Sequence, residues 1–293
     1  MIINQEAYSI NDTVAVNIGT KAWCALLEEV YTTPKPGLVD LHSSGAHIDM
    51  DFHTFEKSAW TLKPYFIQMA YQGYNLNCSA EELFVQIRKT GVAAEQDMYR
   101  VTNSVNTHKG SIFTLGIFCA AAGHCIAKYG KITQESLQNT QQEMTVRILK
   151  QEMEQLKEKK AVSHGEKNYK NYGTTGIRGE AIKGYPTVWK YALPVLRQGI
   201  REHRDFNRVK LETLFVLMSR TEDSNILARQ NPEVLLQVQR KAAELLKKGM
   251  VYAEDAWQKL LDLDVEYTRK NISPGGCADL LATSLFLELL LNE

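Results

Sequence analysis

Apolar residues recur at helical spacing along almost the whole of this 293-residue chain. Near its start, Ala15, Ile18, Ala22, Leu26 and Val30 fall three or four positions apart, so they share one face of a helix. Convincing alternation of apolar and polar residues between turn signals, the pattern of a half-buried strand, is missing from the sequence. The chain is therefore predicted to be all-α. It is also predicted to be a single compact domain over residues 1–293, because no long polar linker interrupts the helices.

The same periodicity predicts further helices, over residues 52–73, 80–101, 109–129, 133–158, 187–203, 205–220, 231–248, 252–268 and 277–291. Ser79 and Glu82 have the spacing of a capping box at the start of one of them. Residues 158–176 stand apart because they are charged, contain glycine and are poor in aliphatic side chains. This segment is predicted to be a loop, either simply solvated or acting as a lid over a charged substrate.

The charge balance excludes a global field that would attract nucleic acid or an anionic membrane, since Lys+Arg and Asp+Glu both number 34. Five cysteines without CxxC spacing argue against a disulfide framework and against structural zinc. The first residues lack the basic and apolar regions of a signal peptide. The two most apolar segments, 111–127 and 277–291, fall short of about 18 uninterrupted apolar residues. These features predict a cytoplasmic protein that does not enter a membrane.

A polar segment, PKPGLVDLHSSGAHIDMD (residues 34–51), breaks the first helix. Pro34 and Pro36 predict an extended turn and Gly37 permits a positive φ, so we expect Lys35 to be presented from a rigid loop. A lysine in such a place suits a phosphate, although an ordinary helix-breaking loop is the alternative. Groups that can bind a hydroxyl or a metal follow in the same segment at Asp40, His47 and Asp49.

Two further segments stand directly before apolar helices, where unpaired backbone N–H groups favour an anion. The first, VNTHKGSIF (residues 105–113), carries Asn106, Thr107, His108 and Lys109. The second, NISPGGCADLL (residues 271–281), carries Ser273 and Gly275 in a turn that can form an anion-binding nest. Asp279 stands in the first turn of the following helix, where a carboxylate simply stabilises the helix dipole. An ordinary helix cap with incidental charges is the alternative for the first segment.

Two more polar segments complete the set. In TTGIRGEAIKGYP (residues 174–186), Arg178 can bind phosphate or carboxylate oxygens, and Glu180 can be a base or a metal ligand. The two residues can equally form a pair that only closes a loop. In SRTEDSNIL (residues 219–227), the side chains of Glu222, Asp223 and Asn225 offer oxygen ligands that suit Mg²⁺, or they form a solvated helix end. Together the five segments indicate a phosphorylated, metal-associated ligand held in one cleft.

These segments, in this order and spacing, resemble the triphosphoribosyl-dephospho-coenzyme A synthase family. The matching motifs are PKPGLVD (34–40), GAHIDMD (45–51), VNTHKGSIF (105–113), GIRGEA (176–181), GYP (184–186), EDSN (222–225) and NISPGGCADLL (271–281). The resemblance spans nearly the whole chain and is weakest over residues 141–175. Cys277 stands where the family pattern has a serine, and Glu222 occupies a position that varies in the family.

The resemblance implies an all-α pentosyltransferase that joins ATP to 3′-dephospho-coenzyme A, releases adenine and forms 2′-(5″-triphosphoribosyl)-3′-dephospho-coenzyme A. This product is the precursor of the prosthetic group of citrate lyase or malonate decarboxylase. The resemblance implies phosphate contacts from Lys35, Lys109 and Arg178. It implies Mg²⁺, bound with ATP, at Asp223 with Asp49 or Glu222. It implies that Glu180 or Asp40 acts as the base and that His108 contacts phosphate or the leaving adenine. The remaining expected substrate contacts are His47, Asn106, Thr107, Asn225, Ser273 and Gly275.

Two other functions fit the residues. One is a Mg²⁺-dependent nucleotide or ADP-ribose hydrolase, which also uses carboxylates on helix ends. The other is a helical interaction module without catalysis, although a bare scaffold has little need for five loops of Lys, His and Asp. The expected partners are ATP and 3′-dephospho-coenzyme A, with no nucleic acid and no membrane, and the sequence allows a homodimer.

Overall fold

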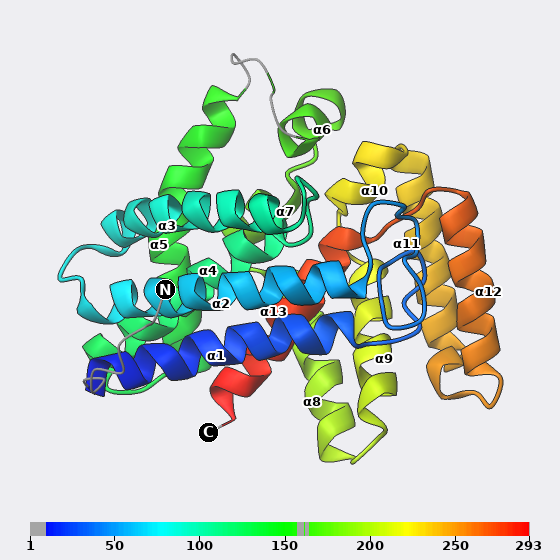
Figure 1. Cartoon of the computed structure of the whole chain (residues 1–293), viewed down its shortest axis with the longest axis horizontal. Coiled ribbons are helices and arrows are strands. Elements are labelled where there is room, and N and C mark those ends of the chain that lie inside the picture. Colours follow the sequence, from blue (N-terminus) through cyan, green and yellow to red (C-terminus); the bar gives the residue numbers. More distant parts are fainter. Residues whose placement is uncertain (1–9, 157–160, 162–163, 293) are drawn as a thin grey trace.

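The computed structural model describes residues 10–156, 161 and 164–292, and all regular structure in these residues is helical (Figure 1). The prediction of an all-α protein is confirmed. The helices are α1 (Ile10–Val30), α2 (Phe52–Asn75), α3 (Ala80–Val101), α4 (Lys109–Tyr129), α5 (Gln134–Gln155), α6 (His164–Tyr172), α7 (Gly176–Lys183), η1 (Val188–Ala192), α8 (Leu193–Arg201), α9 (Phe206–Met218), α10 (Ser224–Arg229), α11 (Pro232–Lys247), η2 (Met250–Tyr252), α12 (Ala256–Arg269) and α13 (Gly275–Leu291).

Helix α4 lies at the centre of the core. It packs against α2, α3, α5 and α13, and most of its residues are buried. Its contact with α2 is close because both helices carry glycine there, and a Cβ atom on Gly73 would lie 2.0 Å from the carbonyl oxygen of Ala120. The length and hydropathy of α4 would also suit a membrane span, yet 72% of its most apolar 18-residue stretch is buried inside the protein. That burial is the normal situation of a core helix.

Side-chain caps set the start of several helices. Ser79 and Glu82 form the expected capping box, in which Ser79 Oγ accepts from the Glu82 N–H at 3.2 Å and Glu82 Oε2 accepts from the Ser79 N–H at 2.9 Å. Asp51 and Thr133 cap α2 and α5 in the same way. Each cap satisfies N–H groups that have no partner within the helix, so the helices begin where the sequence predicts.

The prediction that residues 158–176 form a loop is wrong for part of that segment, because residues 164–172 form helix α6. This short helix has little apolar periodicity, and packing stabilises it. Asn168 is buried, and its Nδ2 donates at 2.9 Å to the backbone oxygen of Ser224, the first residue of α10. Residues 158–160 and 162–163 of the predicted loop lie outside the described residues.

Helix α13 connects the two sides of the molecule. It packs against α1 and α4 on one side and against α8 and α9 on the other (Figure 1). Ala282, Leu285 and Phe286 of this helix are part of the buried core. The N-terminal end of α13 therefore lies beside the N-terminal end of α4, which brings together two of the polar segments predicted from the sequence.

Candidate functional site

A cavity of about 750 Å³ lies where the starts of α4, α7, α10 and α13 meet. Its volume falls in the range usual for a small-molecule site, and all five polar segments contribute to its wall, as expected for segments converging on one cleft. Thirteen of the predicted site residues line it, namely His47, Asp49, Asn106, Thr107, His108, Lys109, Arg178, Glu180, Glu222, Asp223, Asn225, Ser273 and Gly275.

Lys35 and Asp40, which the sequence places in the site, lie outside the cavity wall. Lys35 is buried, and its Nζ donates to the backbone oxygen of Glu29 at 2.8 Å and forms an ion pair with the Glu29 carboxylate. Asp40 is buried too and accepts from the N–H groups of Lys35 at 2.5 Å, His42 at 2.6 Å and Ser43 at 2.9 Å. Gly37 does adopt a positive φ, of 75°. The lysine of this turn points inward, contrary to the prediction, because the buried Glu29 carboxylate needs a counter-charge.

His47 reaches the cavity from the same loop. Its Nδ1 accepts from Arg229 Nη2 at 3.0 Å, so the proton is on Nε2, which donates to Ser273 Oγ at 2.9 Å. Burial, together with the positive charge of Arg229, lowers the pKa of His47 to about 4. His47 is therefore neutral at pH 7 and acts as a hydrogen-bonding group. Arg229, whose role the sequence did not indicate, adds a cation to the cavity wall.

His108 precedes α4 and is fully enclosed. Thr107 Oγ1 donates to Ser58 Oγ at 2.7 Å, and Ser58 Oγ lies 2.7 Å from His108 Nδ1. Burial and the nearby Lys35 charge lower the pKa of His108 to about 3, so its ring stays neutral. Its Nε2 has no hydrogen-bond partner among the described residues. The contact predicted for His108, with phosphate or with the leaving adenine, would therefore be a neutral hydrogen bond from this ring and not an ionic one.

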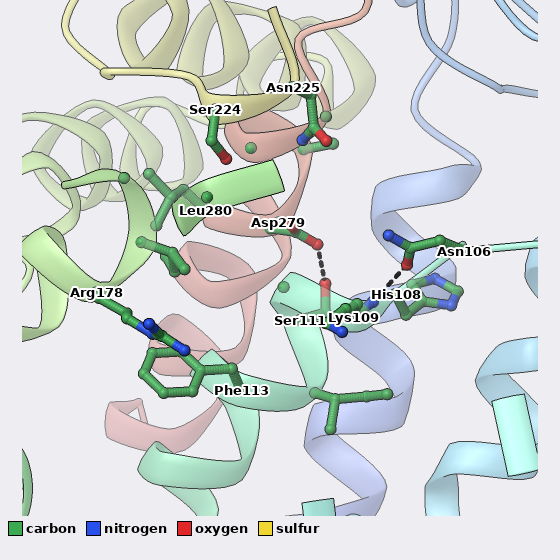
Figure 2. Close-up of a pocket in the computed structure, with 18 of the residues that line it drawn as sticks. Asn106, His108, Lys109, Ser111, Phe113, Arg178, Ser224, Asn225, Asp279 and Leu280 are labelled. Carbon is green, nitrogen blue, oxygen red and sulfur yellow. Dashed lines mark hydrogen bonds between the residues drawn. The ribbon is translucent and has the colours of Figure 1, made fainter. Parts of the chain in front are cut away.

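Lys109 begins α4 at the edge of the cavity. The backbone N–H of Lys109 donates to Asn106 Oδ1 at 3.2 Å, as Figure 2 shows. Its side-chain Nζ forms an ion pair with Glu95 of α3. About half of the Lys109 side chain is exposed, so its ammonium group can exchange Glu95 for a stronger anion.

Arg178 and Glu180 both lie on α7 but have different partners. Arg178 Nη1 lies 3.7 Å from Glu166 Oε1 of α6, which also lines the cavity. Glu180 accepts from Thr187 Oγ1 at 2.8 Å and from the Thr187 N–H at 3.3 Å. Burial raises the pKa of Glu180. The two residues therefore do not form the loop-closing pair that the sequence left open.

The three residues predicted to bind metal differ in what they can offer. Asp223 is buried, and its carboxylate accepts from the N–H groups of Asn225 at 2.8 Å, Ile226 at 3.2 Å and Cys277 at 2.9 Å. Burial nevertheless raises the pKa of Asp223. Glu222 is exposed and accepts from the Thr175 N–H at 2.9 Å. In the described part of the chain, no three His, Cys, Asp or Glu side chains are grouped as a metal centre requires.

Asp279 lines the cavity, although the sequence placed it in the first turn of a helix and predicted only a dipole contact. Helix α13 begins earlier, at Gly275, so Asp279 lies beyond its first turn. Ser111 Oγ of α4 donates to Asp279 Oδ1, and Figure 2 shows this bond joining the two helices at the cavity. Burial, reinforced by the negative charges of Glu29 and Asp223, raises the pKa of Asp279 to about 7. An acidic residue near the start of an otherwise apolar helix is the sequence feature that could have identified Asp279 as a site residue.

A different wall of the cavity is apolar. It consists of side chains from α2, α3, α4 and α5 and from the residue after α5: Met69, Phe84, Ile87, Ile112, Phe113, Ile117, Met153 and Leu156. The cavity therefore has a charged wall and an apolar wall, and the two adjoin at the start of α4, where Ile112 and Phe113 closely follow Lys109. Such a site suits a ligand that is highly charged in one part and uncharged in another.

Comparisons with known proteins agree on one family. The family model for ATP:dephospho-CoA triphosphoribosyl transferase matches residues 15–293. A Salmonella gallinarum protein named "Probable 2-(5''-triphosphoribosyl)-3'-dephosphocoenzyme-A synthase" is 40% identical over 90% of this chain and 87% of its own. A Photobacterium profundum protein of the same name is 35% identical over 98% of this chain and 94% of its own. A solved structure, "Crystal structure of putative triphosphoribosyl-dephospho-coA synthase from Archaeoglobus fulgidus", covers 80% of this chain and 98% of its own with a TM-score of 0.51. At 17% identity, it supports the fold alone.

Proposed function

The chain belongs to the ATP:dephospho-CoA triphosphoribosyl transferase family, and from this premise we propose that it joins ATP to 3′-dephospho-coenzyme A with release of adenine. The product is 2′-(5″-triphosphoribosyl)-3′-dephospho-coenzyme A. The 2′-hydroxyl of dephospho-coenzyme A attacks the anomeric carbon of the ATP ribose, and positive charge develops on that ring as adenine leaves. A single displacement inverts the anomeric configuration from β to α.

The observation that carries this proposal is the charged wall of the cavity. Lys109, Arg178 and Arg229 place three cationic side chains along it, and the N-terminal ends of α4, α7 and α13 add positive dipole ends. The N-cap residues of these three helices make no side-chain cap bond. The triphosphate of ATP is the most negatively charged part of the two substrates, so it is the part that this concentration of positive charge would bind.

The apolar wall of the cavity supports the proposal that dephospho-coenzyme A is the second substrate. Dephospho-coenzyme A carries a long uncharged arm, and its burial against Phe84, Ile112 and Phe113 removes apolar surface from water. Helix α6 contributes Glu166 and Tyr169 to the lining, on the side away from α13. We propose that these residues help to exclude water, because hydrolysis of ATP at the anomeric carbon would compete with transfer.

We also propose that Mg²⁺ enters as part of the nucleotide substrate. Mg²⁺ keeps several waters and commonly shares phosphate oxygens with one or two carboxylates. Asp49 and Glu222 line the cavity and fit that limited role. Asp223 does not fit it, because its carboxylate already accepts three backbone N–H bonds.

The test is incubation of the protein with Mg²⁺, ATP and dephospho-coenzyme A, followed by mass analysis. The expected adduct has the summed mass of both substrates less one adenine. Free ribose triphosphate in place of the adduct would identify a hydrolase, an alternative that the family match does not support. No reaction at all, with no binding of ATP at equilibrium, would favour an interaction module.

The use of the product is a separate proposal. The product suits attachment to the acyl-carrier subunit of citrate lyase or of malonate decarboxylase, in the cytoplasm. Transfer of the group to each purified carrier subunit, with the enzymes that perform the attachment, distinguishes the two.

A further inference from the structure

Asp279 lies at the contact between the two helix starts that form the floor of the cavity. It accepts a hydrogen bond from Ser111, the third residue of α4, and its Oδ2 lies against Gly110. A Cβ atom on residue 110 would lie 2.0 Å from that oxygen, so only glycine permits the carboxylate to sit there. Part of the Asp279 surface remains accessible, and the residue lines the cavity.

Given the proposed function, we propose that Asp279 is the general base that takes the proton from the attacking hydroxyl of dephospho-coenzyme A. A general base must lie within hydrogen-bond reach of its proton and face the bound substrate. Asp279 meets the second condition because it lines the same cavity as Lys109, Arg229 and Ile112, and part of its surface is accessible there.

The step balances without any further reactant. The hydroxyl oxygen forms a bond to the anomeric carbon of the ATP ribose, and its proton passes to Asp279. The bond from that carbon to the adenine nitrogen breaks, and adenine leaves with the electron pair. Asp279 then releases its proton through water, and adenine takes up one proton. Both substrates are thus converted to the adduct and neutral adenine.

The charged groups around Asp279 favour this role. Glu29 of α1 and Asp223 before α10 both raise its pKa, and the Ser111 hydroxyl partly opposes them by stabilising the carboxylate. Burial raises the pKa of Cys277, on the same helix, well above its usual value, so its thiol stays protonated. A pKa of about 7 allows Asp279 both to accept a proton and to release it near neutral pH.

Glu180 and Asp40 are the bases that the sequence predicted, and their surroundings fit the role less well. Asp40 lies outside the cavity wall, and its carboxylate accepts hydrogen bonds from three backbone N–H groups of its own loop. Glu180 lines the cavity, but both of its oxygens accept hydrogen bonds from Thr187. Neither residue joins two helix starts as Asp279 does.

The test compares Asp279→Asn with Glu180→Gln in single-turnover adenine release, over a range of pH. Asp279→Asn is isosteric and should slow the step by about 10²- to 10⁴-fold, the usual contribution of a general base. The dissociation constants of Asp279→Asn for ATP and for dephospho-coenzyme A should stay within about threefold of the wild-type values, because the substitution leaves the shape of the pocket unchanged. The rise of the rate with pH near 7 should disappear in Asp279→Asn and persist in Glu180→Gln. Asp262→Asn, on the exposed face of α12, is the matched surface control.

Ser111→Ala gives a second readout that keeps the carboxylate. Loss of the Ser111 hydrogen bond should move the midpoint of the pH profile upward, because that bond stabilises the charged form. An Asp279→Asn rate within tenfold of wild type with its pH profile intact, or an unmoved midpoint in Ser111→Ala, overturns the assignment. Absence of the adduct from the wild-type protein would instead contradict the proposed function.

Discussion

Arg229 Nη2 donates to His47 Nδ1 at 3.0 Å, and this bond joins the last residue of α10 to the loop after α1, 182 residues earlier in the chain. The other guanidinium nitrogen, Nη1, donates to the backbone oxygen of Ala46 at 2.8 Å and to Asn271 Oδ1 at 2.7 Å. One side chain thus holds the loop after α1 against the loop before α13. Both loops line the cavity, so the shape of the charged wall depends on Arg229.

Substitution of Arg229 should therefore affect both stability and nucleotide binding. Arg229→Ala should lower the free energy of unfolding by about 1–3 kcal/mol, because it leaves partly buried acceptors without a donor. It should also weaken ATP binding by about tenfold or more through loss of a cation. Arg229→Lys retains the charge but not the planar fork, so it should lose stability while keeping more of the ATP affinity. Urea unfolding and titration calorimetry separate these effects, and equal ATP affinity in all three proteins would contradict them.

The two buried histidines should make the protein less stable in acid. The pKa is lowered to about 4 for His47 and to about 3 for His108, below the unfolded value near 6.5. The unfolded chain therefore binds protons that the folded chain does not, and stability should fall as pH decreases from about 6.5 towards 4. The loss should be of the order of 2 kcal/mol or more.

Urea unfolding at several pH values measures that slope. His47→Gln and His108→Gln should each flatten it, whatever their stability at pH 7. His53 is largely exposed, so His53→Gln is the matched control and should leave the slope as in wild type. An equal slope in wild type and in both buried-histidine variants would show that other groups control the acid response.

Lys35 should contribute to folding rather than to nucleotide binding. Both side chains of the Lys35–Glu29 pair are nearly inaccessible, with exposures of 1% and 5%. Lys35→Met should lower the free energy of unfolding by about 3–5 kcal/mol, because it leaves a buried carboxylate unpaired. The double variant with Glu29→Gln should recover much of that loss. If folded Lys35→Met instead lost ATP affinity at unchanged stability, Lys35 would be a phosphate contact after all.

Lys109 and Glu95 allow a matched comparison at the rim of the cavity. Lys109→Ala should weaken ATP binding by about tenfold or more, since an ionic contact to phosphate is lost. Its helical circular-dichroism spectrum should be unchanged because the side chain is half exposed. Glu95→Gln releases Lys109 from its ion pair, so ATP should bind as tightly as in wild type or more tightly. A weaker ATP complex in Glu95→Gln would contradict the idea that Glu95 competes with phosphate.

Most of the fold was predictable because helical periodicity and capping are local properties of the sequence. The capping box at Ser79 and the helix over residues 109–129 illustrate this, as both occur where the sequence places them. Helices α6, α7 and α10 were not predicted, because they are short and depend on contacts with distant segments. Asn168 of α6 packs against Ser224, a contact 56 residues away in the chain.

The members of the site were more predictable than the directions of their side chains. Local chemistry identified the segments that line the cavity, but Lys35 turned inward to a glutamate in the preceding helix. Asp279 was discounted because a carboxylate in a first helical turn has an ordinary explanation. Its central position depends on Gly110 and Ser111, 168 or more residues earlier in the chain, and the sequence pattern does not reveal such pairings.

The proposed function requires that the protein transfer a triphosphoribosyl group rather than hydrolyse ATP. The most direct measurement is the amount of adenine released from ATP with and without dephospho-coenzyme A, with the adduct quantified in the same samples. We expect one adenine for each adduct when both substrates are present, and no adenine from ATP alone. Adenine released at the same rate without dephospho-coenzyme A, and without adduct, would contradict the account.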